Sequence, residues 1–349
     1  MAEAGERALA RQTGFEALEE YAERSGFDAW STLEGLLRGD GVTPSEMLKS
    51  LLDGLRERVQ SGFSTLLRGI LPPTLLCVLL RLLLGRERAA TGMSGLLCSL
   101  CCALVLGGQL ADARGTAEAF LEEVNRVSGA LTPVLVSAAT LTGAAATASI
   151  MTPLAAECAD LINLLFRDVG LRLCMAAGVV AVAGSLSPRF TLQRMFAMLK
   201  GAVRWSLAAS MFAFGALMSA RGLMGAARDT AAIQAAKLAL ENLVPVIGGE
   251  VSGSAGSLAA SAGAVCRAVG LTGMAFILHT CVLPMLELGA GMLSMKLIAA
   301  VLEPLAGDVP AVAMVGRFGE LMELLLAICF GAAVVTALLA GGCTVLLGI

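Results

Sequence analysis

Charged side chains are scarce in this sequence. Only 15% of its 349 residues are charged, whereas a soluble domain of this size carries about 25%. Hydrophobic residues make up 57%, and charge is densest near the N-terminus. This balance excludes an ordinary soluble enzyme. With a net charge of −3 and no dense run of lysine or arginine, nothing indicates nucleic-acid binding.

Residues suited to catalysis and metal binding are also few. The chain has one histidine, His279, so imidazoles alone cannot build a zinc site. The CxxC spacing of Cys98 and Cys101 has no second such pair and lies in an apolar run, where free cysteine is usually small apolar filler. No Gly-Lys-Ser or Gly-Lys-Thr occurs, which excludes a phosphate-binding loop. The sequence therefore predicts no enzyme, no catalytic residue, no cofactor and no metal site.

An acidic head precedes the apolar body. Residues 1–62 hold 7 basic and 12 acidic side chains, and residues 63–349 hold 18 and 16. Within the head, Thr43 to Glu46 has the pattern of a helix start, followed by leucines at helical spacing. The first 20 residues are charged throughout and lack the apolar core of a signal peptide. We therefore expect an amphipathic helical head over 1–62 and a multi-pass membrane domain over 63–349.

Long apolar runs with few or no charges dominate the body. A bilayer core needs about 20 apolar residues per helix. The stretches that approach or exceed this length are about 66–84, 89–111, 127–156, 173–188, 201–220, 268–286 and 324–346. Amphipathic stretches between them predict helices that lie at the membrane interface. The expected fold is an all-α polytopic integral membrane protein with six to eight transmembrane helices and amphipathic interfacial helices.

The positions of basic residues predict the orientation. Cytoplasmic loops are rich in lysine and arginine, so the loops around Arg86 and Arg189 should both be cytoplasmic. Three predicted spans lie between these loops, and an odd number would put them on opposite sides. One of these assignments must therefore be wrong, and the first to question is the span at 127–156, which contains Pro133 and Pro153. A cytoplasmic Arg86 loop places the head outside the cytoplasm, which normally needs a cleaved leader.

Three ionisable residues are candidates for polar positions within the membrane: Arg81, His279 and Glu323. Ionisable side chains inside a membrane commonly mark pathways or gates. The ordinary alternative for Arg81 and Glu323 is anchoring at a helix end. For His279 the ordinary alternative, and the favoured one, is a hydrogen bond to a neighbouring helix.

The segment 235–249 combines an amphipathic helix with a break. Proline ends a helix because it lacks an N–H, and glycine permits a positive φ at the exit. The candidates for a structural corner or assembly surface are Lys237, Glu241, Asn242, Pro245, Gly248 and Gly249. One interpretation is a simple turn after an interfacial helix over about 226–244. The other is a ring of such helices around the opening of a symmetric oligomer.

This corner also resembles the signature of the stage III sporulation protein AE family, in which a lysine-bearing helix ends in a Pro-Val-hydrophobic-Gly turn. Here Pro245 to Gly248 reads Pro-Val-Ile-Gly. Similar pieces follow in order at Gly270 to Gly273, Leu283 to Met285, Lys296 to Ala300, Leu302 to Leu305 and Gly307-Asp308. The resemblance covers about residues 45–349. Its order and spacing are more specific than any single piece.

The resemblance implies a multi-pass protein of endospore-forming bacteria, in the mother-cell membrane around the forespore. It implies membership of the channel-like assembly that joins the two cells and supports late forespore gene expression. The expected partners are other membrane subunits of the stage III complex, further copies of the chain, and lipid. Members usually begin with a cleavable leader, which this sequence does not show, and none of their residues is assigned a catalytic role.

Two other function classes compete with this interpretation. Broken helices and small-residue interfaces also suit a stand-alone secondary transporter or permease. A membrane enzyme is disfavoured because His, Asp and Glu do not cluster along the sequence. A ring-like oligomer with stable partners would favour the channel subunit, and a monomer that binds a small solute would favour the transporter.

Overall fold

The protein is a bundle of long helices. A computed structural model describes residues 88–141, 145–186, 192–243, 248–306 and 310–346, and these are helical almost throughout, with no strand among them. The all-α prediction is therefore confirmed for the described part of the chain. The predicted head over 1–62, its boundary at residue 63, the span at 66–84 and Arg81 all lie outside the described residues.

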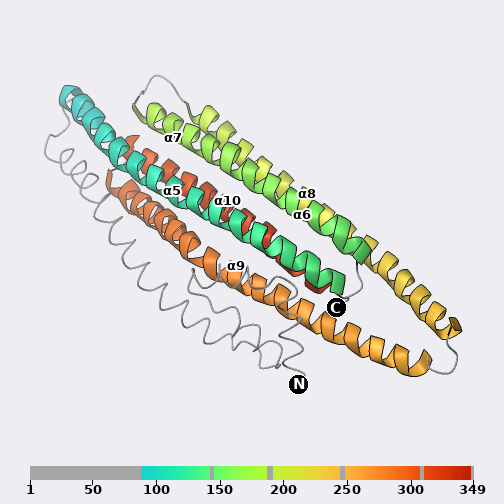
Figure 1. Cartoon of the computed structure of the whole chain (residues 1–349). Helices are drawn as coiled ribbons and strands as arrows, with labels where there is room; N and C mark the ends of the chain where they lie inside the picture. Colours follow the sequence, from blue (N-terminus) through green and yellow to red (C-terminus); the bar gives the residue numbers. More distant parts are fainter. Residues whose placement is uncertain (1–87, 142–144, 187–191, 244–247, 307–309, 347–349) are drawn as a thin grey trace.

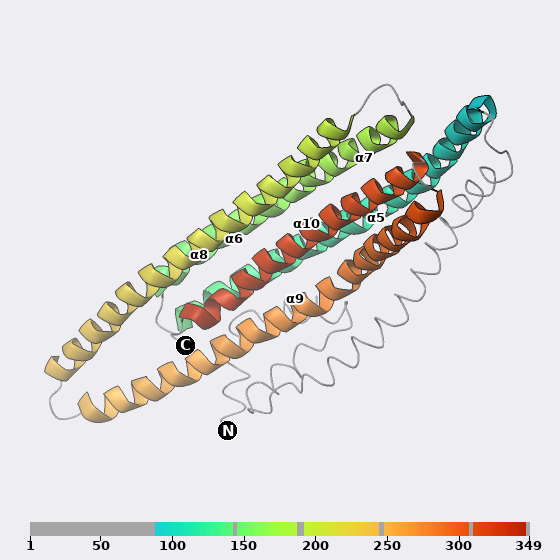
Figure 2. The same cartoon turned by 180° about the vertical axis from the view of Figure 1, so that it is seen from behind.

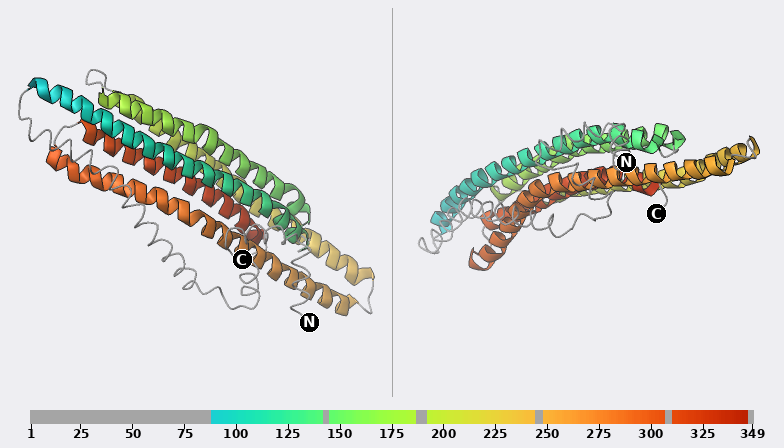
Figure 3. Two further views of the ribbon diagram at one scale, coloured as in Figure 1. Left: turned by 60° about the vertical axis from the view of Figure 1, so that its left-hand side comes forward. Right: turned by 60° about the horizontal axis from the view of Figure 1, so that its bottom comes forward.

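Six α-helices and one π-helical turn follow one another in the described part of the chain. They are α5 (Arg88–Leu141), α6 (Ala145–Leu165), the π turn η1 (Phe166–Gly170), α7 (Leu171–Leu186), α8 (Gln193–Leu243), α9 (Gly248–Ala306) and α10 (Pro310–Leu346). The turn η1 joins α6 and α7 without a loop, so the three form one rod. All rods run along one common direction (Figure 1) and curve gently together (Figure 3).

The two ends of the bundle differ. At one end, here called the proximal end, α5, α8 and α10 begin and α7 and α9 end (Figure 1). At the other, the distal end, the hairpin of α8 and α9 extends past the ends of α5 and α10 (Figure 2). Thus α5 and α10 point one way, and the α6–α7 rod returns to the end where α5 begins.

The core lies around α10, which packs against α5, α7, α8 and α9. Buried residues recur on α10 at helical spacing, among them Phe318, Leu321 and Ile328, as expected for a helix surrounded by others. Gly331 lets three helices meet. A Cβ built there would lie 2.7 Å from Leu207 Cδ1 and 3.2 Å from a ring carbon of Phe166.

Fewer candidate membrane spans appear than the six to eight predicted for the whole chain. Within the described ranges, three helical segments are long and apolar enough to cross a bilayer: Gln193–Ser219, Leu271–Val301 and Val312–Ala340. The prediction treated 89–111 and 127–156 as separate spans. In the structure α5 carries the first and part of the second, with the charged stretch from Asp112 to Arg126 between them.

The predicted span at 173–188, in the α6–α7 rod, is also not among these three segments. Arg167 and Asp168 sit in its π turn, and α7 itself has only 16 residues. The run 127–156 is divided between the end of α5 and the start of α6. The chain therefore makes two passes between Arg88 and residue 187 instead of three. The described helix starts next to the two loops that the basic residues predict to be cytoplasmic, those of α5 and α8, both lie at the proximal end (Figure 1).

The amphipathic stretches predicted as separate interfacial helices continue the apolar ones. Residues 221–243 extend α8, and residues 288–306 extend α9. Extending an existing helix needs no new nucleation, and residues 221–243 contain no proline. The change from apolar to amphipathic composition therefore does not mark where the helix ends.

Candidate functional site

Ion pairs join the three candidate spans at one level of the bundle. Lys200 Nζ of α8 donates to Glu320 Oε2 of α10 at 2.8 Å. Arg204 Nη2 of α8 donates to Glu323 Oε1 at 2.8 Å. Lys296 Nζ of α9 donates to the other oxygen of Glu323 at 2.6 Å. We call these five residues the charged cluster.

Helical spacing explains why the pairs match. Lys200 and Arg204 are four residues apart on α8, and Glu320 and Glu323 are three apart on α10. Each spacing puts both side chains on one face of its helix. Because α8 and α10 begin at the same end and run in parallel, the two bases meet the two acids in order.

Lys296 reaches the cluster from the opposite direction. It lies near the end of α9, which runs antiparallel to α10 and returns to the proximal end. A Cβ at Gly319 would lie 3.3 Å from Cγ of Lys296. The absence of a side chain at Gly319 therefore leaves room for the lysine stem on its way to Glu323.

The charged cluster holds three cations and two carboxylates, a net of +1. Its side chains are partly exposed, from 21% for Lys200 to 52% for Arg204. In apolar surroundings an isolated charge is costly, and each ion pair reduces that cost. The arrangement can fasten three helices together. It offers no nucleophile beside a base, and no group of three or more metal-ligating side chains occurs among the described residues.

Two of the three predicted intramembrane polar residues are described. Glu323 is the centre of the charged cluster, where it accepts from two helices. His279 lies half-buried on α9, within the segment Leu271–Val301. It precedes Lys296 by 17 residues, or about 25 Å along a helix, so the structure does not bring His279 and Glu323 together.

The predicted corner falls between α8 and α9. Lys237, Glu241 and Asn242 lie on α8, which ends at Leu243. Pro245 lies outside the described residues, and α9 begins at Gly248, with Gly249 next to it. The end of α8 and the start of α9, which flank Pro245, lie at the tip of the distal hairpin (Figure 2). Its part in assembly stays a prediction.

Sequence reasoning missed four members of the charged cluster. Glu323 was a candidate polar residue within the membrane, but Lys200, Arg204, Lys296 and Glu320 were not. The sequence does contain a signal for these ion pairs, because two basic residues lie on one face of one apolar helix and two acidic residues lie on one face of another. Which helices are neighbours, however, depends on the fold.

Comparison with known proteins gives a consistent result. The family model described as "Stage III sporulation protein AE" matches residues 27–344. A curated protein of the same name from Bacillus subtilis (strain 168) is 22% identical over 280 residues, which cover 79% of this chain and 70% of that protein. No solved structure matches the chain.

Proposed function

The chain belongs to the stage III sporulation protein AE family, and on this premise we propose that it is a non-enzymatic membrane subunit of the channel-like assembly between mother cell and forespore. In this role it supports late gene expression in the forespore. It crosses the mother-cell membrane several times, binds other membrane subunits of the stage III complex and associates with copies of itself.

The observation that carries the proposal is the charged cluster. Three apolar helices, α8, α9 and α10, are tied at one level by Lys200, Arg204 and Lys296 to two carboxylates. These charged side chains pair with one another, which suits a scaffold that must hold its helices in register within lipid. A catalytic centre would instead leave a reactive group facing a substrate.

The distribution of basic residues supports the orientation. Arg88 and Arg194 lie at the proximal end, close to the ends of their helices. By the positive-inside rule this end faces the cytoplasm of the mother cell. The distal hairpin of α8 and α9 then extends toward the space between the two membranes, where partner subunits of the assembly are within reach.

Affinity purification tests the proposal. The tagged chain is produced in the spore-former that encodes it, and membranes are solubilised during engulfment. We expect a large complex containing several copies of the chain and other sporulation membrane proteins, and deletion of the gene to reduce heat-resistant spores by several orders of magnitude. A monomer that copurifies with no partner and binds a small solute would instead support the stand-alone transporter.

A further inference from the structure

The polar side of α5 lies at the same depth as the three apolar spans. Leu110 of α5 and Leu321 of α10 both approach the same glycine of α7, so they mark one level. Leu131 of α5 and Ala340 of α10 both approach the same glycine of α9 and mark a second level. The charged stretch between Leu110 and Leu131 therefore lies beside the segment Val312–Ala340, which is apolar enough to span a bilayer.

The α6–α7 rod adds charge at the same depth. Phe166 and Arg167 are successive residues of the π turn η1. Phe166 packs against Gly331 inside the segment Val312–Ala340, while Arg167 Nη2 donates to Glu122 of α5 and lies 3.6 Å from Glu118. The π turn thus directs an apolar ring to the core and a guanidinium to the polar side.

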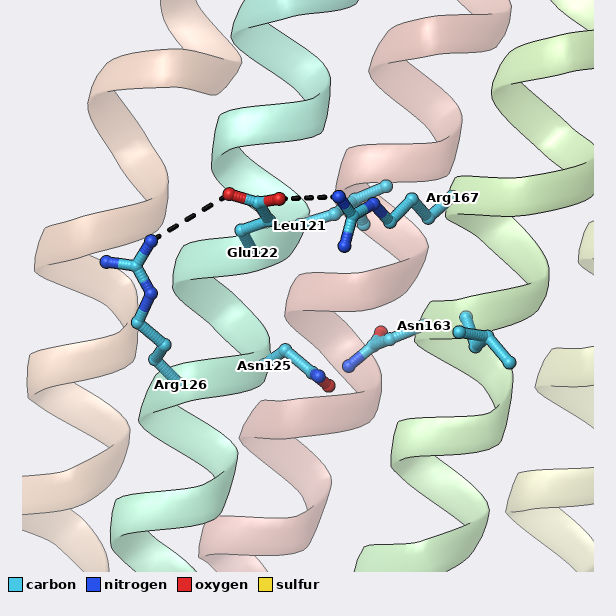
Figure 4. Close-up of a pocket in the computed structure, with 7 residues that line it drawn as sticks. Leu121, Glu122, Asn125, Arg126, Asn163 and Arg167 are labelled. Atoms are coloured by element: carbon cyan, nitrogen blue, oxygen red, sulfur yellow. Dashed lines mark hydrogen bonds and ion pairs between the residues drawn. The ribbon is translucent and has the colours of Figure 1, made fainter.

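A cavity of about 310 Å³ opens between α5 and α6 on this polar side. Figure 4 shows Glu122, Asn125, Arg126, Asn163 and Arg167 around it. Since one water molecule needs only about 15 Å³ of such space, the cavity has room for several water molecules. Its wall combines guanidinium, carboxylate and amide groups with Leu121 and Leu164, and the charged and amide groups make it a surface poorly suited to lipid chains.

One wall residue lacks any partner. Asn163 is 3% exposed, and neither its amide nitrogen nor its oxygen has a hydrogen-bond partner among the described residues. Buried polar atoms in proteins are satisfied by protein or by ordered water. By this rule, Asn163 requires water in the cavity as its partner.

We infer that the polar side of α5 and α6 forms the wall of a water-filled passage at bilayer depth, and that the cavity beside Asn163 is part of it. The inference rests on the proposed membrane function and assigns the passage to a particular face. Non-lipid surroundings are required there, since lipid gives no partner to charged and amide groups.

The charge of this polar side favours water, and not a second copy of the chain, as the medium that contacts it. Residues 112–126 and 157–172 together hold four basic and seven acidic side chains, a net of −3. Two copies that met through this face would bring like charges together, which is unfavourable. A water-filled passage screens the excess, and its negative wall attracts small cations over anions.

Cysteine accessibility tests the inference in the intact assembly. All ten cysteines are replaced by alanine or serine, and single cysteines are introduced by Ala119→Cys and Asn125→Cys on the polar side. The matched controls are Ala208→Cys and Ala209→Cys, which are exposed on α8 at the same depth, next to Leu207 at Gly331. Native membranes are treated with membrane-impermeant thiosulfonate reagents of either charge, which react with the thiolate and hence only in water.

We expect the polar-side cysteines to react at least tenfold faster than the controls, and faster with the cationic reagent than with the anionic one. Spore counts identify variants that fold and assemble. Slow reaction at all four positions would mean that protein covers the face, and the passage would be refuted while the membrane function stood. Fast reaction at the controls would show that no bilayer lies at this depth, and both proposals would fall.

Discussion

Glu323 holds two helices at once, through Arg204 of α8 and Lys296 of α9. Glu323→Gln keeps the shape and removes the charge, so two cations lose their counter-ion in an apolar environment. We expect the free energy of unfolding in mild detergent to fall by about 1–2 kcal/mol, the range for a hydrogen bond to a charged group after allowance for partial exposure. Thermal denaturation with a fluorescent thiol probe measures the change.

A double-mutant cycle separates this pair from general effects of substitution. Lys296→Met alone should also destabilise, and the double variant should lose less than the sum of the two single losses, because the second change removes a group already without its partner. Strict additivity would show that the Lys296–Glu323 ion pair contributes nothing.

Gly331 is a position where η1, α8 and α10 approach one another closely, since its Cβ would meet Leu207 of α8 and Phe166 of η1. Gly331→Val should therefore force repacking and lower the free energy of unfolding by about 1–3 kcal/mol. Gly316→Val on the same helix is the matched control, because nothing lies within 4 Å of a Cβ there. Equal melting temperatures for the two variants would contradict the packing.

At this scale the sequence indicated Glu323 but not its partners. A charged residue in an apolar run is visible in the sequence, and so is its spacing. The identity of its partners depends on which helices are neighbours and in which register, because Arg204 and Glu323 are 119 residues apart. The polar cavity was missed for the same reason, since Asn163 and Arg126 meet only after α5 and α6 pack together.

Among the elements, the helix break at the distal hairpin was predictable and the helix lengths were not. Proline at position 245 and glycine at 248 are local signals, and α8 ends at Leu243 while α9 begins at Gly248. The continuity of α8 and α9 through changes of composition has no local signal. A charged stretch in the sequence suggests the end of a membrane helix. The helix nevertheless continues through it when its backbone hydrogen bonds are uninterrupted.

The corner itself is testable as an element. Pro245→Ala together with Gly248→Leu removes both the helix-ending ring and the flexible exit, so the end of α8 should extend and the hairpin tip should change direction. We expect normal amounts of the variant in the membrane fraction but at least a several-fold loss of complex on size-exclusion chromatography. Ala236→Leu, within α8, is the control and should assemble normally. Full assembly of the corner variant would remove the corner from the interface.

For the whole molecule, length is the informative quantity. At about 1.5 Å per residue, the 51 residues of α8 and the 59 of α9 reach about 77 and 88 Å, whereas a hydrocarbon core is about 30 Å thick. Much of both helices must therefore lie outside the bilayer. Because the spans of α8 and α9 lie toward the proximal end, the part outside is the distal hairpin.

This arrangement predicts the outcome of cutting the hairpin. A specific protease site inserted between Pro245 and Val246 should be cleaved in right-side-out membrane vesicles, where the extracytoplasmic surface is exposed, and protected in inside-out vesicles. Because α8 and α9 each pack on α10 and meet through Arg204, Glu323 and Lys296, the two fragments should stay together during purification in mild detergent. Adding Glu323→Gln should weaken that association. Cleavage from the cytoplasmic side would show that the proposed orientation is reversed. If the fragments of the otherwise unaltered chain separate, the hairpin connection holds the bundle together, and the charged cluster with its surrounding core does not.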